Sequence, residues 1–173
     1  IKGKGGHGAA PQGTIDTIVV ASQLINALQT IVSRNTNPLD NTVVTIGKIQ
    51  GGDNFNIIAD KVKLAGTTRA YTEENRQLIK NRISEIIDGI SVSFGADIVL
   101  DYEDGYPPTI NHSIPTENVM KAASRVVGKG AGSPYLSMGG EDFSYYLQKI
   151  PGCFFFIGSA PDNRDVFSTP HHC

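Results

Sequence analysis

The chain has 173 residues, of which 39% are hydrophobic and 18% are charged, and its formal net charge is -2. This composition is typical of a globular protein with one ordinary domain, or one small domain and part of another. The near-neutral charge argues against nucleic acid and anionic membranes as partners, because both attract a basic surface. No apolar stretch approaches the roughly 20 residues that span a bilayer. Two cysteines cannot form a disulfide framework for a chain of this size, so we expect a reducing, cytoplasmic setting.

The first predicted element is an amphipathic helix. Thr14 can act as its N-cap, and Asp16 would lie in its first turn. The helix should end before Pro38, because a proline disfavours a helical predecessor. Its apolar positions recur at helical spacing and are Ile18, Ala21, Ile25, Leu28 and Val32.

Two strands and a second helix should follow. Residues 42–49 are rich in β-forming side chains, residues 51–54 are a turn signal, and residues 57–70 continue as a long strand. The second helix should begin at Thr72, with acidic residues near its positive end, and should break at Gly95. Its predicted apolar stripe consists of Ile79, Ile83, Ile86 and Ile90.

A last strand completes the first predicted domain. Ile98, Leu100 and Tyr102 alternate with other residues, and residues 1–3 resemble the tail of a first strand. The order is then βαββαβ, which predicts an α+β ferredoxin-like domain with an antiparallel sheet and both helices on one face. We assign this domain to residues 1–105. One face of the sheet would remain uncovered by helices, so we expect two copies to form a homodimer through their helices or sheet edges.

Residues 106–173 have a different pattern. A third helix is predicted at about residues 116–127 and a short fourth helix at residues 141–147. A buried strand, which begins with a cysteine, should follow at residues 153–158. This remainder is too small to bury both faces of a parallel sheet. We therefore expect it to be the C-terminal part of a larger α/β domain whose other strands precede Ile1.

The first candidate for chemistry is His7. Residues 3–8 match the dinucleotide-binding pattern GxGxxG, but Pro11 interrupts the expected helix and no complete strand precedes the pattern. A nucleotide site is therefore disfavoured. The remaining interpretation is a close-packed glycine loop that presents His7, and the alternative is a structural histidine.

The second candidate is a pair of histidines near the end of the chain. Adjacent residues rarely ligate one metal together, so one of His171 and His172 would be a ligand, for which zinc, manganese, cobalt or nickel is suited. A solvated tail is the alternative. A zinc site made with His112 and Cys173 lacks any spacing signature.

Three more polar residues each have a functional and a structural interpretation. Arg69 would bind a carboxylate through two parallel hydrogen bonds or be an exposed strand residue. Asn56 follows a diglycine turn and is otherwise a turn residue. Glu141 is otherwise a helix start.

Six motifs, in order along nearly the whole chain, resemble those of one family. Residues 3–11 look like its GKGGHAAxP motif, residues 51–58 like GGxxxNVIP, and residues 66–69 match GTxR. The other three motifs are YPPT, MGGEDF and PHH, at residues 106–109, 138–143 and 170–172. The family is the aminoacylase and carboxypeptidase group of co-catalytic metallohydrolases. The most similar branch contains the N-acyl amino acid, hippurate and indole-acetyl amino acid amidohydrolases.

This resemblance implies a homodimeric enzyme in which a ferredoxin-like lid interrupts an α/β catalytic domain. Two metal ions would bridge a water, a glutamate would act as general base, and the hydroxide would attack an amide carbonyl. The substrate would be an N-acyl amino acid or a small peptide conjugate. Most metal ligands and the glutamate would precede residue 1, so we expect the chain to be inactive alone.

The resemblance also implies roles for polar residues of the lid. His7 would reach into the partner subunit's active site and stabilise the developing oxyanion. Asn56 and Arg69 would hold polar ends of the substrate, with Arg69 on its carboxylate. Ala59 replaces the proline of the NVIP motif, which should loosen that turn slightly.

Further roles fall in the second half of the chain. Gly139 and Gly140 would let the backbone approach the substrate, with Glu141 beside them. Gly140 stands where many relatives have serine, which should affect the acyl groups that fit. His172 would ligate a metal, or His171 if the register differs by one residue.

Two alternatives to an N-acyl amino acid hydrolase remain. One is a metallo-dipeptidase or carboxypeptidase with the same mechanism. The other is a non-enzymatic ferredoxin-like dimer that binds a small molecule. The second alternative leaves the glycine loop, the Glu141 region and the terminal histidines unexplained.

Overall fold

The computed structural model describes residues 1–128, 131–132 and 136–157. The chain divides into two compact units: the first comprises Ile1–Pro108 and the described part of Tyr135–Glu141, and the second comprises the remainder. The assignment of residues 1–105 to a lid and 106–173 to a catalytic domain stays a prediction. Within the described part, no helix has both the length and the apolarity needed to cross a membrane.

Helix α1 (Thr17–Thr30) begins after Asp16, whose carboxylate accepts hydrogen bonds of 3.0 and 3.2 Å from two backbone amides in the first turn. Asp16 is therefore the N-cap. The prediction that Thr14 caps the helix was wrong, because its hydroxyl donates instead to the carbonyl oxygen of Pro11 at 2.7 Å. The helix continues into a π-helical turn, η2 (Ile31–Asn35).

The buried face of α1 is rotated from the predicted one. The hydroxyl of Thr17 is buried and donates to the carbonyl oxygen of Ala59 at 2.8 Å, which fixes the rotation of the helix. Two of the five apolar positions predicted for the helix, Ile18 in α1 and Val32 in η2, are 48% and 37% exposed. The buried residues of α1 are Thr17, Val20, Ala21, Leu24 and Leu28.

The main ladder is antiparallel and consists of β2 (Thr42–Gly51) and β4 (Val62–Ala70). Val43 lies opposite Arg69 at one end, and Gly51 lies opposite Val62 at the other. The predicted strand at residues 57–70 is interrupted after two residues. Its first part is β3 (Ile57–Ile58), which pairs with β1 (Gly6–His7) in a separate two-stranded sheet.

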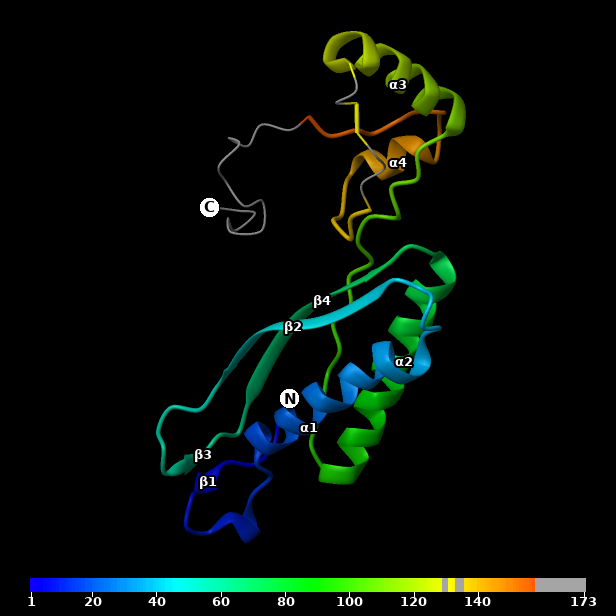
Figure 1. Ribbon diagram of the computed structural model, residues 1–173. Coiled ribbons are helices and arrows are strands. Elements are labelled where there is room, and N and C mark those ends of the chain that lie inside the picture. Colours follow the sequence, from blue (N-terminus) through cyan, green and yellow to red (C-terminus); the bar gives the residue numbers. More distant parts are fainter. Residues whose placement is uncertain (129–130, 133–135, 158–173) are drawn as a thin grey trace. The chain divides into compact units, whose positions relative to one another are not determined.

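Helix α2 (Glu73–Phe94) begins and ends where the sequence predicts. The hydroxyl oxygen of Thr72 accepts the Asn75 amide at 3.2 Å, and Gly95 ends the helix with φ +66°. Helices α1 and α2 cover one face of the β2/β4 ladder (Figure 1). The core between them consists of Leu24, Leu28, Ile31, Val44, Ile79, Ile83 and Ile87, with Ile86 and Ile90 only partly buried.

The first unit is thus an α+β fold, but its outer strands are short. Residues 98–102, predicted as a strand, form no ladder. Pairing there is limited to a bridge between Lys2 and Asp97, and Lys2 also bridges Lys61. The continuous four-stranded sheet that the alternation predicted is therefore reduced to ladders and single bridges in the described residues.

The second unit contains α3 (Ser113–Val127), which ends at Gly128, and α4 (Phe143–Leu147). Residues 153–157 do not form the predicted strand, and the backbone of Phe154 is bonded to a side chain instead. Asn111 donates to the carbonyl oxygen of Phe154 at 2.8 Å and accepts its amide at 2.7 Å. Cys153, predicted to be buried, is partly buried.

Candidate functional site

The first group of candidate residues lies in the β1/β3 region, which consists of the paired segments 3–8 and 56–58. Strand β1 ends with His7 opposite Ile57, and the amide of Gly8 donates to the carbonyl oxygen of Asn56 at 2.8 Å. A Cβ at Gly8 would lie 3.0 Å from that oxygen, so a side chain would push the two segments apart. The glycines therefore allow the close approach that brings His7 beside Asn56.

The imidazole of His7 is exposed and oriented by its own turn. Its Nδ1 accepts the backbone amide of Ala9 at 3.1 Å. When Nδ1 is an acceptor, the proton of the neutral ring is on Nε2. The β1/β3 region therefore presents a fixed N–H donor to an acceptor outside this chain.

Asn56 has a similarly exposed side chain. Its backbone oxygen accepts the amide of Gly8, whereas its side-chain amide makes no hydrogen bond with any described residue. An amide has both a donor and an acceptor. Asn56 can thus bind either kind of polar group.

The second group lies at the other end of the ladder, around Arg69. Because residues directly opposite in a ladder share a face, the side chains of Arg69 and Val43 lie on the face away from Val44, which is buried in the helix-covered core. The Arg69 guanidinium makes one long hydrogen bond, 3.4 Å, to the carbonyl oxygen of Thr68. Arg69 takes part in none of the ion pairs among the described residues. It can therefore receive a carboxylate in bidentate geometry.

Gly140 lies near Arg69, and its predicted role in substrate binding stays a prediction. A Cβ at Gly140 would lie 3.1 Å from Cδ2 of Tyr106 and 4.0 Å from Nη1 of Arg69. The preceding amide, that of Gly139, donates to the hydroxyl of Ser137 at 3.1 Å, and Glu141 is partly buried. The absence of a side chain at Gly140 leaves space beside the guanidinium.

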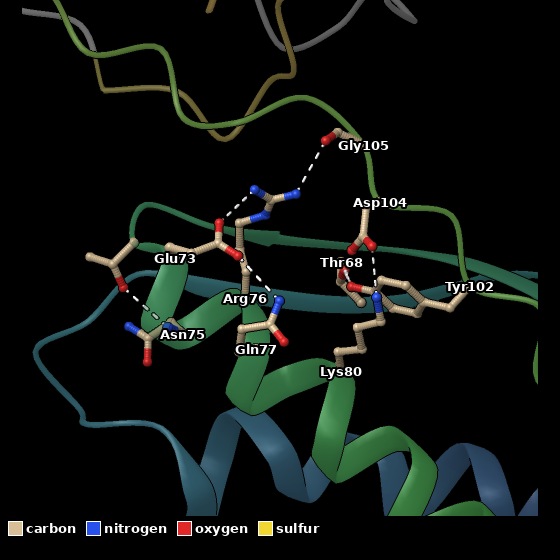
Figure 2. Close-up of polar contacts among 10 residues, drawn as sticks. Thr68, Glu73, Asn75, Arg76, Gln77, Lys80, Tyr102, Asp104 and Gly105 are labelled. Carbon is tan, nitrogen blue, oxygen red and sulfur yellow. Dashed lines mark hydrogen bonds and ion pairs between the residues drawn. The ribbon is translucent and has the colours of Figure 1, made fainter. Parts of the chain in front are cut away.

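The segment that precedes Tyr106 is tied to α2 by polar contacts (Figure 2). Lys80 of α2 forms an ion pair with Asp104 at 2.7 Å, and Arg76 donates to the carbonyl oxygen of Gly105 at 3.2 Å. Sequence reasoning gave Tyr106 no role, although it opens the YPPT motif. The available signal was that motif alone, because nothing in its spacing pointed to Gly140.

The two groups do not meet within one chain. Seven residues of β4 separate Val62 from Arg69, which is about 23 Å at 3.3 Å per residue. Strand β1, which ends with His7, and strand β3, which Asn56 immediately precedes, lie at the end where β4 begins (Figure 1). The structure therefore brings together His7 with Asn56 and Arg69 with Gly140, but not the first pair with the second.

A metal centre is not formed by the residues that the structure describes. Within residues 1–128, 131–132 and 136–157, no three His, Cys, Asp or Glu side chains gather closely enough to hold a metal ion. His171 and His172 lie outside the described residues. The described donors thus do not fit a dinuclear metal site.

Together, the first unit has an α+β fold and two groups of exposed polar side chains, one around His7 and one around Arg69. The peptidase dimerisation domain family, M20_dimer, matches residues 1–93, and the chain belongs to this family. The resemblance to metal-dependent amidohydrolases and peptidases is confirmed.

Three similar proteins illustrate the family. YhaA of Bacillus subtilis (strain 168) is 40% identical over 173 residues, which cover 98% of this chain and 43% of YhaA. An N-acetyldiaminopimelate deacetylase of Bacillus cytotoxicus is 44% identical over 158 residues, covering 91% of this chain and 42% of the relative. The crystal structure of YXEP of Bacillus subtilis, a dinuclear metal binding peptidase from the M20 family, matches with a TM-score of 0.61 and 31% identity over 80% of this chain and 35% of that one. The chain thus spans less than half the length of these relatives.

Proposed function

We propose that this chain is the dimerisation and substrate-recognition part of a metal-dependent amidohydrolase. The reaction is hydrolysis of the amide bond of an N-acyl amino acid or small peptide conjugate, which releases a free amino acid and a carboxylic acid. The observation that carries this proposal is the separation of His7 and Arg69 by the length of β4, with both side chains exposed. The name of the deacetylase relative supports the same reaction class.

A symmetric dimer reconciles this separation with a single active site. In a two-fold dimer the same surface of both copies forms the interface, so opposite ends of one subunit can face each other across the axis. His7 of one copy then completes the site that contains Arg69 of the other. Each dimer holds two such composite sites.

Two features of the first unit support a homodimer. Among the described residues, β2 pairs on one edge only, and an unpaired edge is a template for another strand. Ile18 and Val19 of α1 are also 48% and 47% exposed. Both features suit burial against a second copy of the dimerisation domain.

We further propose the ferredoxin-like strand order for the first unit. Lys2 bridges Asp97 on one side and Lys61 on the other, and β4, which begins at Val62, pairs with β2. The spatial order of the four segments is then fourth, first, third and second. This is the order of the split βαβ arrangement, and residues 1–105 would form this lid.

The proposed roles follow from the chemistry of the exposed groups. Arg69 binds the substrate carboxylate in bidentate geometry, and Gly139 and Gly140 allow the substrate to approach the backbone. Asn56 binds another polar group of the substrate. The Nε2–H of His7 donates to the oxygen that becomes negative during attack on the amide, and such a donor is typically worth about 3 kcal/mol of barrier.

Two divalent metal ions (zinc, manganese, cobalt or nickel) complete the proposed enzyme. Their ligands would lie outside the residues that the structure describes, and His172 would be one of them. When bound, they supply a water of lowered pKa as the nucleophile. Residues 106–173 would belong to the catalytic domain that carries them. The described residues supply substrate recognition instead.

Subunit complementation tests this proposal in the complete metal-loaded enzyme. The His7→Ala and Arg69→Ala variants are purified separately and should each be nearly inactive on N-acetyl amino acids. After unfolding and refolding together, half of the dimers are mixed, and each mixed dimer contains one site with both residues intact. Activity should therefore return to about one quarter of the wild-type value.

The controls for this experiment are the two variants refolded alone, which should stay inactive, and a His7→Ala/Arg69→Ala double variant mixed with wild type. Mixing the double variant with wild type should remove activity from the mixed dimers, because each of their sites lacks one residue. If the mixed single variants recover no activity while forming dimers, the composite site is wrong. If the wild-type enzyme hydrolyses dipeptides but no N-acyl amino acid, the substrate assignment is wrong.

A further inference from the structure

The first unit has an open sheet face, which is the side of the β2/β4 ladder that α1 and α2 do not cover (Figure 1). Val44 belongs to the helix-covered core and Leu64 packs against it, so the residues that alternate with Leu64 along β4 lie on the open face. Those residues of β4 are all exposed and are Lys63, Ala65, Thr67 and Arg69.

Four lysines gather on this face at the end where β4 begins. Lys2 and Lys61 stand opposite each other in an antiparallel bridge whose flanking hydrogen bonds, of 2.8 and 3.0 Å, are made by their neighbours. A pair of this kind holds its side chains closer than a hydrogen-bonded pair, with Cα atoms about 4.5 Å apart. Lys63 lies about 7 Å further along the strand. Lys48 stands opposite Ala65, which makes it a diagonal neighbour of Lys63 at about 7–8 Å.

This lysine cluster (Lys2, Lys48, Lys61 and Lys63) has little compensating charge. Asp97, which bridges Lys2 on its other side, is the one carboxylate that stands beside the cluster in the ladders and bridges of the described residues. None of the four lysines takes part in the ion pairs of that part of the chain. Like charges directly opposite each other destabilise a sheet. The cluster therefore lowers the stability of the fold, which points to a role toward an anion outside it.

We propose that the lysine cluster is an electrostatic guide that draws the anionic substrate toward the active site. The proposal rests on the proposed function, in which the substrate carries a carboxylate that Arg69 receives. Arg69 shares the open face six residues beyond Lys63, which is roughly 20 Å, and the residues between them on that face, Ala65 and Thr67, are small. The cluster lies at the His7 end of the ladder (Figure 1), so in the proposed dimer it borders the composite site.

A small anion suits this face better than a long polyanion. The chain as a whole has a formal net charge of -2, so a polyanion that extended beyond the cluster would meet repulsion. Lysine ammonium groups are point charges on flexible stems, which attract an anion without fixing its geometry. Neighbouring members of the cluster are closer than the Debye length, about 10 Å at 0.1 M salt, so their fields add. The cluster thus acts over a distance, whereas Arg69 makes the fixed contact.

The test is the dependence of kcat/KM on ionic strength, measured with N-acetyl-leucine and the complete metal-loaded enzyme. We expect the wild-type kcat/KM to fall at least about threefold between about 10 mM and about 300 mM salt. The kcat value should stay constant, because the guide acts before the substrate is bound. The triple variant Lys48→Gln/Lys61→Gln/Lys63→Gln should have a low kcat/KM at every salt concentration. Glutamate at the same three positions should reverse the sign, so that kcat/KM rises with salt.

The matched control is Lys121→Gln/Arg125→Gln/Lys149→Gln, which removes the same charge from exposed residues of the second unit and should keep the wild-type salt dependence. If the control loses that dependence as fully as the lysine variant, or if the wild-type kcat/KM does not change with salt, the guide is wrong while the proposed function stands. Retention on heparin that requires the lysine cluster, without any effect on kcat/KM, would assign the face to a polyanionic partner and overturn the guide. If the wild-type enzyme hydrolyses no N-acyl amino acid, the proposed function is wrong and the guide with it.

Discussion

The hydroxyl of Tyr102 lies 2.8 Å from Oγ1 of Thr68, the residue immediately before Arg69 in β4. Lys80 also lies over the Tyr102 ring, 5.1 Å from its centroid (Figure 2). The segment that precedes Tyr106 is thus anchored to the strand end that carries Arg69. This anchor holds both sides of the proposed carboxylate site in register.

Tyr102→Phe should weaken this anchor without disturbing the core. The change removes one partly buried hydrogen bond, so the free energy of unfolding should fall by about 1 kcal/mol. Because Tyr106 lies against Gly140, KM for an N-acyl amino acid should rise more than kcat falls. Urea unfolding and steady-state kinetics measure the two effects. Tyr146→Phe, whose hydroxyl makes no hydrogen bond with described residues, is the control and should change neither quantity.

The effect of a substitution at Gly140 on KM should increase with the size of the new side chain. A Cβ there would be 3.1 Å from the Tyr106 ring, a distance that a shift of a few tenths of an ångström relieves. Gly140→Ser should therefore fold normally and raise KM only a few-fold, whereas Gly140→Val should raise KM far more by crowding Arg69. Gly47→Ala, where a Cβ meets nothing within 4 Å, provides the comparison. Equal KM values for the serine and valine variants would contradict close packing at Gly140.

His7→Ala should lower activity without lowering stability. The side chain is exposed and its one hydrogen bond is to a neighbouring amide, so the midpoint of thermal unfolding should stay within experimental error. Loss of an oxyanion donor should reduce kcat by about 100-fold to 1,000-fold. Lys4→Ala, in the same segment (residues 3–8), tests whether a disturbance of that segment alone reduces kcat. A His7→Ala enzyme with wild-type kcat would rule out the proposed donor.

Asp16→Ala should destabilise the start of α1. The carboxylate accepts two amide hydrogen bonds, and loss of such a cap typically costs about 1 kcal/mol. Asp16→Asn keeps an acceptor and should retain most of the stability. Chemical unfolding of the three proteins measures the difference. Thr14→Ala should have a smaller effect, since Thr14 does not cap the helix.

The two glycines of α2 should respond to alanine in opposite directions. Gly95 has φ +66°, a conformation that costs roughly 1 kcal/mol for a residue with a Cβ, so Gly95→Ala should be destabilising. Gly89 lies inside the helix with open space around it, so Gly89→Ala should be stabilising by about 0.5–1 kcal/mol. Thermal unfolding of the pair checks both signs. A Gly95→Ala protein as stable as the wild type would contradict the helix end at Gly95, and destabilisation by Gly89→Ala would contradict the open space around Gly89.

The sequence predicted best the features that depend on local chemistry. Thr72 and Gly95 delimit α2 because capping and the left-handed conformation are properties of those residues themselves. The rotation of α1 could not be predicted, because it depends on the hydrogen bond from Thr17 to Ala59, 42 residues away. Within residues 153–157, where a strand was predicted, the backbone of Phe154 is bonded to the side chain of Asn111, 43 residues away.

The arrangement of the candidate site residues could not be predicted from the sequence. The family motifs indicated His7, Asn56, Arg69 and Gly140 one by one, and both their membership of a site and their roles stay predictions. The close contact of Gly140 with Tyr106 joins positions whose sequence separation carries no periodic signal.

The length of β4 has a consequence for how such an enzyme would behave in solution. A monomer would hold the arginine of one centre and the histidine of another, and neither centre would be whole. Specific activity would then depend on total protein concentration and would fall on dilution below the dissociation constant of the dimer, even though every molecule remained folded.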